Sequence, residues 1–205
     1  QDLHGTAVRL LGRIELVALQ RQYALAGSQV VYAPTFQAQP IALERVNLHK
    51  QTEAVNAHLV ALSKSAAPGC LIAGDITTLA TFCDSWDEAS FDLLVDNYRR
   101  QIHGLIEGGA DILVGETLLY PQEAEAILCA AELEGAGAQM YSFTMQGDGS
   151  LFSGADAGKV LKDLEEAGAA AVGCSAQMIG FAVASYRENK MGGLVAQGVG
   201  TSMLQ

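Results

Sequence analysis

The sequence predicts an α/β fold in which helices flank a parallel sheet, and two observations support this class. First, one pattern occurs four times: a segment ends in glycine and a short apolar run follows. The glycine and the run occupy 26–36, 108–117, 137–144 and 167–175. Glycine readily closes a helix, because it adopts left-handed backbone angles without strain. Second, the apolar runs are nearly continuous, which is typical of parallel strands that are buried on both faces.

Each expected element has its own local evidence. A fifth strand, at 70–78, follows the turn-forming pair at 68–69 instead of a helix-closing glycine. Between the strands, apolar residues recur at helical spacing with Lys, Arg and Glu among them. The strands are expected at 28–36, 70–78, 110–117, 138–144 and 169–175. The helices are expected at 7–26, 42–66, 87–107, 121–135 and 156–167.

The composition describes one globular domain spanning 1–205. Half of the 205 residues are apolar, 17% are charged, and no tract has low complexity. The net charge of −11 argues against a nucleic-acid partner, because phosphate binding requires clustered Lys and Arg. No apolar run reaches the length of a membrane span, and no secretory leader opens the chain. These features predict a cytoplasmic protein with no membrane partner.

Polar side chains gather where the expected strands end. Ligands bind at the carboxyl ends of the strands in parallel α/β sheets and barrels, so these residues form one candidate site. The candidates are Thr35, Gln37, Asp75, Thr77, Thr78, Glu116, Thr117, Ser142, Thr144, Cys174 and Ser175.

Two carboxylates in this group have competing interpretations. Glu116 directly follows the apolar run at 112–115, where a charge usually needs a partner. It is either a structural acid bonded to a neighbouring loop or the acceptor for a substrate ammonium group. Asp75 has the same two interpretations, because Thr77 and Thr78 could form a local capping arrangement with it.

The four cysteines are scattered and form no Cys-x-x-Cys motif, which predicts free thiols. Cys70, Cys83 and Cys129 are interpreted as small packing residues. Cys174 differs from them, because it lies at the end of an expected strand and precedes Ser175.

Five motifs in register on successive strand ends resemble the homocysteine S-methyltransferase family, especially the homocysteine-binding module of cobalamin-dependent methionine synthases. They are Tyr-Ala-Pro-Thr-Phe-Gln-Ala (32–38), Ala-Gly-Asp-Ile-Thr-Thr (73–78), Gly-Glu-Thr-Leu (115–118), Ser-Phe-Thr with Gly-Asp-Gly and Ser-Gly (142–154), and Ala-Val-Gly-Cys-Ser (171–175). The resemblance covers residues 14–175 and implies a TIM-type (β/α) barrel with zinc at its mouth.

The resemblance also implies a methionine-forming chemistry. A free thiol has a pKa of roughly 8.5, and zinc holds it as the reactive thiolate at neutral pH. On this basis Cys174 would be a zinc ligand and, with Glu116, a catalytic residue. Methylcobalamin or methyltetrahydrofolate would be the methyl donor, and a corrinoid protein or domain a partner. Homocysteine or a related thiol would bind among Thr35, Phe36, Asp75, Glu116, Thr117, Ser142 and Ser175.

The sequence departs from the family pattern in its cysteines and in its order. Members of the family carry an adjacent cysteine pair, whereas this chain has none, so three sulfur ligands cannot be assembled from it. The last segment, 191–205, resembles the family's opening strand, which indicates a circularly permuted barrel; the alternative is an unrelated glycine-rich strand. Only about six βα units can be counted against the eight of a full barrel, so the barrel is incomplete or its open edges are covered in a homo-oligomer.

Three functions are compatible with these observations. The first is a zinc-dependent S-methyltransferase that acts on homocysteine. The second is an inactive shortened scaffold or a module that binds a small amino acid without the full zinc site. The third is an unrelated barrel enzyme, which the lack of a glycine-rich phosphate loop and of a strand-end lysine disfavours.

Overall fold

The computed structural model describes residues 3–82, 86–167 and 171–174, with side chains for 14–82 and 86–167. Five parallel strands form one sheet in the order β1-β2-β3-β4-β5. The strands are β1 (Val30–Tyr32), β2 (Leu71–Thr77), β3 (Ile112–Leu118), β4 (Gln139–Phe143) and β5 (Ala171–Cys174). The helices are α1 (Leu3–Leu25), α2 (Pro40–Leu43), α3 (Thr52–Ala66), α4 (Glu88–Glu107), α5 (Pro121–Leu133) and α6 (Ala157–Glu166). The 3-10 turns are η1 (Glu44–Val46), η2 (His49–Gln51) and η3 (Ala80–Phe82).

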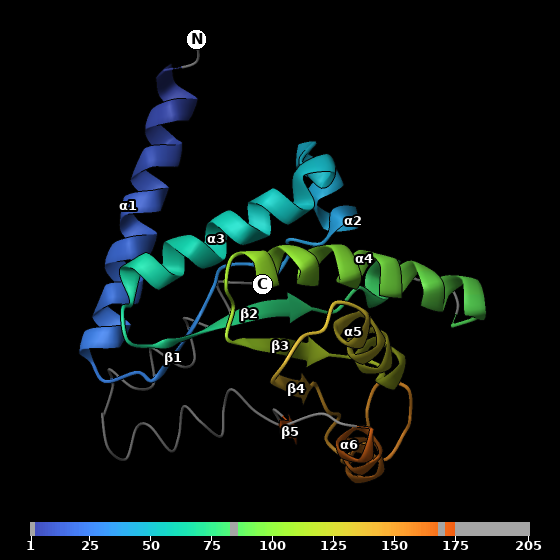
Figure 1. Ribbon diagram of the computed structural model, residues 1–205. Coiled ribbons are helices and arrows are strands. Elements are labelled where there is room, and N and C mark those ends of the chain that lie inside the picture. The colour runs from blue at the N-terminus through green and yellow to red at the C-terminus, as the bar shows by residue number, and fades with distance from the viewer. Residues whose placement is uncertain (1–2, 83–85, 168–170, 175–205) are drawn as a thin grey trace.

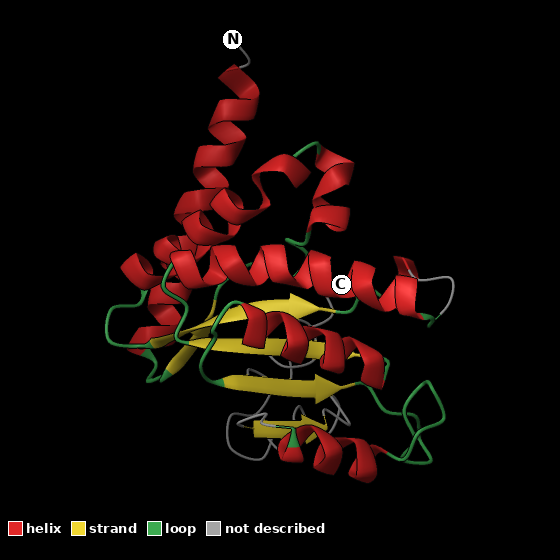
Figure 2. Cartoon of the chain, turned by 45° about the vertical axis from the view of Figure 1, so that its right-hand side comes forward, coloured by secondary structure: helices red, strands yellow, loops and turns green. Residues whose placement is uncertain are grey.

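The strand order identifies the sheet as part of a barrel and not as a doubly wound sheet. Every strand pairs with the next one along the chain, whereas a doubly wound sheet reverses its order at a switch point. Helices α3 to α6 lie on one side of the sheet (Figure 1, Figure 2). The arrowheads of β2, β3 and β4 all point to the same end of the sheet. Within the described residues the barrel is open, with β1 and β5 at its two edges.

Glycines allow the helices to approach the sheet and one another. A Cβ at Gly74 of β2 would lie 2.8 Å from a methyl carbon of Leu105 in α4, and one at Gly115 of β3 would lie 2.9 Å from the Tyr141 ring. A Cβ at Gly108 would lie 2.7 Å from the Ala57 carbonyl oxygen, so α3 and α4 are in close contact. The core between sheet and helices is built from fully buried side chains, among them Ile72, Ile76, Tyr98, Ile102, Leu105 and Ile127.

The predicted elements agree with the observed ones except in three places. The helix expected at 7–26 begins four residues earlier, at Leu3. The helix expected at 42–66 is broken into α2, two 3-10 turns and α3, because Asn47 adopts a left-handed conformation with φ of 58°. The strand expected at 28–36 shrinks to Val30–Tyr32. Pro34 comes two residues after the end of the strand and has no N–H to donate to the neighbouring strand.

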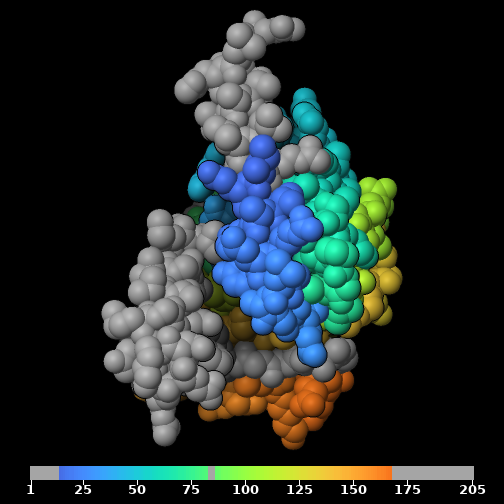
Figure 3. Space-filling view, turned by 90° about the vertical axis from the view of Figure 1, so that its left-hand side faces the viewer, coloured from blue at the N-terminus to red at the C-terminus, as the bar shows by residue number. Residues whose placement is uncertain are grey.

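The first helix lies on the outside of the barrel. Figure 3 shows α1, in blue, against α3, in teal, where the two helices are in contact. No helix within the described part of the chain is both long and apolar enough to cross a membrane. The segment 191–205, on which the circular permutation rests, and Ser175 lie outside the described residues, so the permutation stays a prediction.

Candidate functional site

Side chains of a strand point alternately to the two faces of the sheet, so the candidate site and the core between sheet and helices lie on opposite faces. Because Gly74 and Gly115 face the helices, their neighbours Asp75 and Glu116 face the opposite, inner side of the sheet. The strand register pairs Asp75 with Val114 and Thr77 with Glu116. The two carboxylates therefore lie on adjacent strands, on the same face, near the carboxyl end of the sheet.

Both carboxylates are protonated more readily than ordinary acids. Asp75 is 7% exposed, and burial, followed by the charge of Glu116, raises its pKa to about 8. Burial also raises the pKa of Glu116. The Oδ1 atom of Asp75 is buried and has no hydrogen-bond partner among the described residues.

A tyrosine belongs to the same electrostatic cluster. Burial raises the pKa of Tyr32 to about 12, and the charges of Glu116 and Asp75 contribute to this shift. Tyr32 is the last residue of β1 and pairs with Ala73 of β2. Three acidic groups thus face the inner side, and no cation of the described residues contributes to any of the three pKa shifts. Such an arrangement favours a positively charged ligand group.

Thr35 holds Asp75 in place through the backbone. Its hydroxyl donates to the Asp75 carbonyl oxygen and accepts from the Asp75 N–H, both at 2.9 Å. Gln101 of α4 donates to the carbonyl oxygens of Thr35, at 2.7 Å, and of Asp75, at 3.2 Å. Because Thr35 and Gln101 are fully buried, these bonds fix the backbone position from which the Asp75 carboxylate projects.

An irregularity in β3 follows Glu116. Thr117 adopts a positive φ of 54°, and the register with β4 shifts between Gly115 and Leu118. The Thr117 N–H donates to the Ser142 hydroxyl at 3.2 Å, and the hydroxyls of Thr117 and Thr77 are 3.4 Å apart. A β-branched residue in this conformation is strained, and such strain is typical of functional sites.

A cavity of about 350 Å³ opens at this end of the sheet. Asp75 and Glu116 do not line it themselves, but Thr77 and Thr117, which are close to them in sequence on the same two strands, do. It combines aromatic and aliphatic surface with threonine hydroxyls. Its lining residues are Phe36, Gln37, Gln39, Ala42, Arg45, Thr77, Thr78, Leu79, Thr81, Phe82, Thr117, Leu119 and Thr144.

The remaining predicted site residues are only partly placed. Cys174 ends β5 and pairs in register with Phe143, so its backbone reaches the same edge of the sheet as Ser142. Its side chain and the whole of Ser175 are outside the described part of the structure. The described residues contain no group of three or more His, Cys, Asp or Glu side chains that could hold a metal ion. They therefore do not fit a three-sulfur zinc site.

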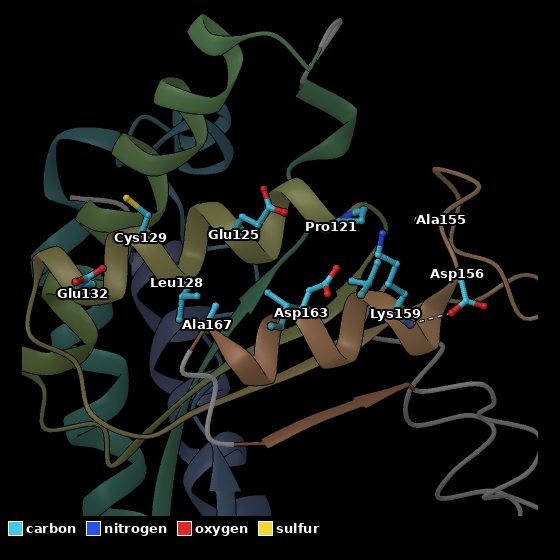
Figure 4. A pocket seen from close by; sticks show the side chains of 12 residues that line it. Pro121, Glu125, Leu128, Cys129, Glu132, Ala155, Asp156, Lys159, Asp163 and Ala167 are labelled. Atoms are coloured by element: carbon cyan, nitrogen blue, oxygen red, sulfur yellow. Dashed lines mark hydrogen bonds between the residues drawn. The ribbon is translucent and has the colours of Figure 1, made fainter.

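A second, larger cavity of about 700 Å³ lies on the outside of the barrel between α5 and α6 (Figure 4). Glu125 and Glu132 of α5 and Asp163 of α6 line it, together with Lys159. All four of these charged residues come from the two helices and none from a strand end. We assign the candidate site to the smaller cavity, because strand-end residues of β2 and β3, Thr77 and Thr117, line that one.

Sequence reasoning missed Glu123, a buried carboxylate close to the site. It is the third residue of α5 and accepts hydrogen bonds from two loops and from α4. Pro121 followed two residues later by glutamate is a recognisable helix start, so a local pattern was present. Gln101 was missed without any such pattern, because it lies in the middle of a helix.

Comparison with known proteins is consistent with this fold. Residues 8–189 match the family model described as homocysteine S-methyltransferase. Crystal structures of the homocysteine methyltransferase MmuM from Escherichia coli have similar folds. The metallated form is 23% identical, with a TM-score of 0.68 over 78% of this chain and 62% of that one. The oxidised form is 21% identical, with a TM-score of 0.71, and the match covers 85% of this chain and 66% of that one.

The chain spans less than two thirds of the length of these solved relatives. The structural likeness establishes the fold, an α/β arrangement similar to the barrel of MmuM. The family model matches most of the sequence and is independent of the structure. The chain therefore belongs to the homocysteine S-methyltransferase family.

Proposed function

We propose that this protein transfers a methyl group to the thiol of homocysteine, forming methionine. One observation carries the proposal beyond family membership. Asp75 and Glu116 form a carboxylate pair at the mouth of the sheet, and no cation of the described residues contributes to their pKa shifts. An amino-acid ammonium group is the cation that such a pair would bind. The cavity beyond the pair has the scale of a small-ligand site.

In this proposal the residues of the site have separate roles. Glu116 and Asp75 accept hydrogen bonds from the ammonium group, and the bound positive charge favours their ionised forms. Thr35 keeps Asp75 in position through its backbone. Thr117, Ser142 and Ser175 contribute polar contacts, and Phe36 supplies apolar surface for the methylene carbons of the substrate. The substrate sulfur then points outward, where a donor can approach.

Binding of the free amino acid tests the first step. L-Homocysteine should bind at least about tenfold more tightly than 4-mercaptobutyrate, which has the thiol and the carboxylate but no ammonium group. Isothermal titration calorimetry under reducing conditions measures both affinities. Equal affinity for the two thiols would remove the role proposed for the carboxylate pair.

We also propose Cys174 as a ligand for zinc, which in this family would activate the substrate thiol. Because the described residues supply no further set of ligands, zinc should bind more weakly than at a three-thiolate site. Competition with a chromogenic chelator should show zinc binding that Cys174→Ser abolishes. Cys129→Ser, on the outer side of α5, should leave it unchanged. Equal binding by the two variants would exclude Cys174 as a ligand.

The donor that we would test first is methylcobalamin or methyltetrahydrofolate, presented by a corrinoid protein or domain. This choice rests on the resemblance of the motifs to the cobalamin-dependent group. The second candidate function is an amino-acid-binding module without transferase activity. The sequence has no adjacent cysteine pair, which favours this second function. The two functions differ in methionine formation and not in homocysteine binding.

A further inference from the structure

We propose that Glu123 is a positioning residue, which sets the shape of the strand-end cavity by holding together the two loops that follow β2 and β3. The inference rests on the proposed function only for the identity of the ligand. Its structural part depends on contacts that are independent of any substrate.

Glu123 is fully buried and accepts five hydrogen bonds. Its Oε1 atom accepts from the hydroxyl of Thr78 and the N–H of Leu79, both at 2.7 Å, and from the hydroxyl of Tyr98 at 3.3 Å. Its Oε2 atom accepts from the N–H groups of Leu119 at 3.1 Å and Tyr120 at 3.2 Å.

The donors belong to elements that are distant in the sequence. Thr78 and Leu79 follow β2, whereas Leu119 and Tyr120 connect β3 to α5. One carboxylate therefore joins two neighbouring loops, with one oxygen for each. All five partners are donors, which suits a carboxylate, because it only accepts. Local capping of α5 would need only the bond from the Tyr120 N–H, so the other four exceed what capping requires.

The same loops form the wall of the cavity. Thr78 and Leu79, from the loop after β2, line the cavity, and so does Leu119, from the loop after β3. Thr117, which follows Glu116 directly, also lines it. A change in the spacing of the two loops would alter the cavity without touching Asp75 or Glu116.

A spectroscopic reporter lies in contact with this region. Trp86, the single tryptophan of the chain, packs on the ring of Tyr120 with their centroids 4.5 Å apart and an interplanar angle of 40°. Tyr120 donates its N–H to Glu123. Movement of the loop after β3 should therefore change the emission of Trp86, with no other tryptophan to obscure it.

The test compares Glu123→Gln with Glu53→Gln. The amide that Glu123→Gln introduces must turn its NH₂ towards donors of one of the two loops, and the hydrogen bonds on that side are lost. Glu53 is a matched control, because it bonds Arg100 on the outer side and reaches neither loop. We expect Glu123→Gln to shift Trp86 emission to longer wavelength. Hydrogen exchange at Leu79, Leu119 or Tyr120 should rise about tenfold, whereas Glu53→Gln changes neither.

Tyr98→Phe is a milder variant that removes one donor to Glu123, together with the bond from the same hydroxyl to the Thr77 carbonyl oxygen at 3.3 Å. It should shift the Trp86 emission in the same direction by a smaller amount, which keeps the test available if Glu123→Gln does not fold. Unchanged emission and exchange in a folded Glu123→Gln would overturn the proposal. A shift of equal size in Glu53→Gln would overturn it too.

Ligand binding completes the test. Glu123→Gln should weaken L-homocysteine binding about tenfold, and Glu53→Gln should leave it within about twofold even where both lower the midpoint of urea unfolding. Loop changes in Glu123→Gln without a change in affinity would contradict a positioning role. If the unaltered protein binds no homocysteine, the proposed function fails, while emission and exchange still decide whether Glu123 holds the loops.

Discussion

Replacing Glu116 by glutamine is expected to raise the dissociation constant for L-homocysteine about thirtyfold, or about 2 kcal/mol. The variant keeps the size of the side chain and removes the charge that would face the substrate ammonium group. Hydrogen bonds that involve charged groups are worth about this amount. Isothermal titration calorimetry on the folded variant measures the loss.

Two controls show whether the loss reflects recognition of the ammonium group. Binding of 4-mercaptobutyrate, which lacks that group, should change less than about twofold in Glu116→Gln. Glu125→Gln, an exposed change in the outer cavity between α5 and α6, should leave both ligands unaffected. An equal loss for the two ligands would mean that Glu116 acts on the fold of the site and not on the amino group.

The second large effect is expected on stability. Asp75→Asn should raise the free energy of unfolding of the ligand-free protein at pH 8 by about 2–4 kcal/mol. The folded protein holds the Asp75 proton up to a pKa of about 8, whereas the unfolded chain releases it near the ordinary value of 3.8. The contribution of Asp75 is thus complete below about pH 4 and is lost as the pH rises towards 8.

Urea unfolding between pH 4 and 8 measures this slope. The gain in Asp75→Asn should shrink towards zero at about pH 4, because both states of the parent protein then hold the proton. Asp92→Asn, a change on the exposed face of α4, serves as the control and should add no slope. A gain of the same size at both ends of this pH range would show that burial of the charge is not its cause.

The two acids could be predicted from the sequence because their placement follows from strand periodicity. Asp75 and Glu116 each follow an apolar run, and the register of parallel strands brings such ends together. The same reasoning placed Cys174 at the end of β5. Whether Glu116 had a partner could not be predicted, because a partner would come from a distant loop.

Features that depend on contacts between distant segments could not be predicted from the sequence. The left-handed conformation of Thr117 is unfavourable for a β-branched residue, so local preference predicts the opposite. Glu123 draws its five donors from three separate parts of the chain, although Pro121 predicted where its helix begins. The break at Asn47 was missed because apolar spacing continues through it.

The carboxylate pair also links stability to function. In the ligand-free protein the buried Asp75 and the half-buried Glu116 resist ionisation, which opposes folding at neutral pH. A bound ammonium group would relieve this cost, so homocysteine should stabilise the protein beyond simple occupancy of a cavity. This coupling distinguishes a ligand-binding site from a pair of structural acids.

The measurement that tests the central claim most directly is methionine formation from L-homocysteine, followed by mass spectrometry with an isotopically labelled methyl group. Methylcobalamin and methyltetrahydrofolate would be supplied as donors, with and without added zinc. The proposed function predicts labelled methionine from the unaltered protein and at least about a tenfold lower rate from Glu116→Gln. No labelled methionine under any of these conditions, from protein that binds homocysteine, would contradict the transferase and favour the binding module.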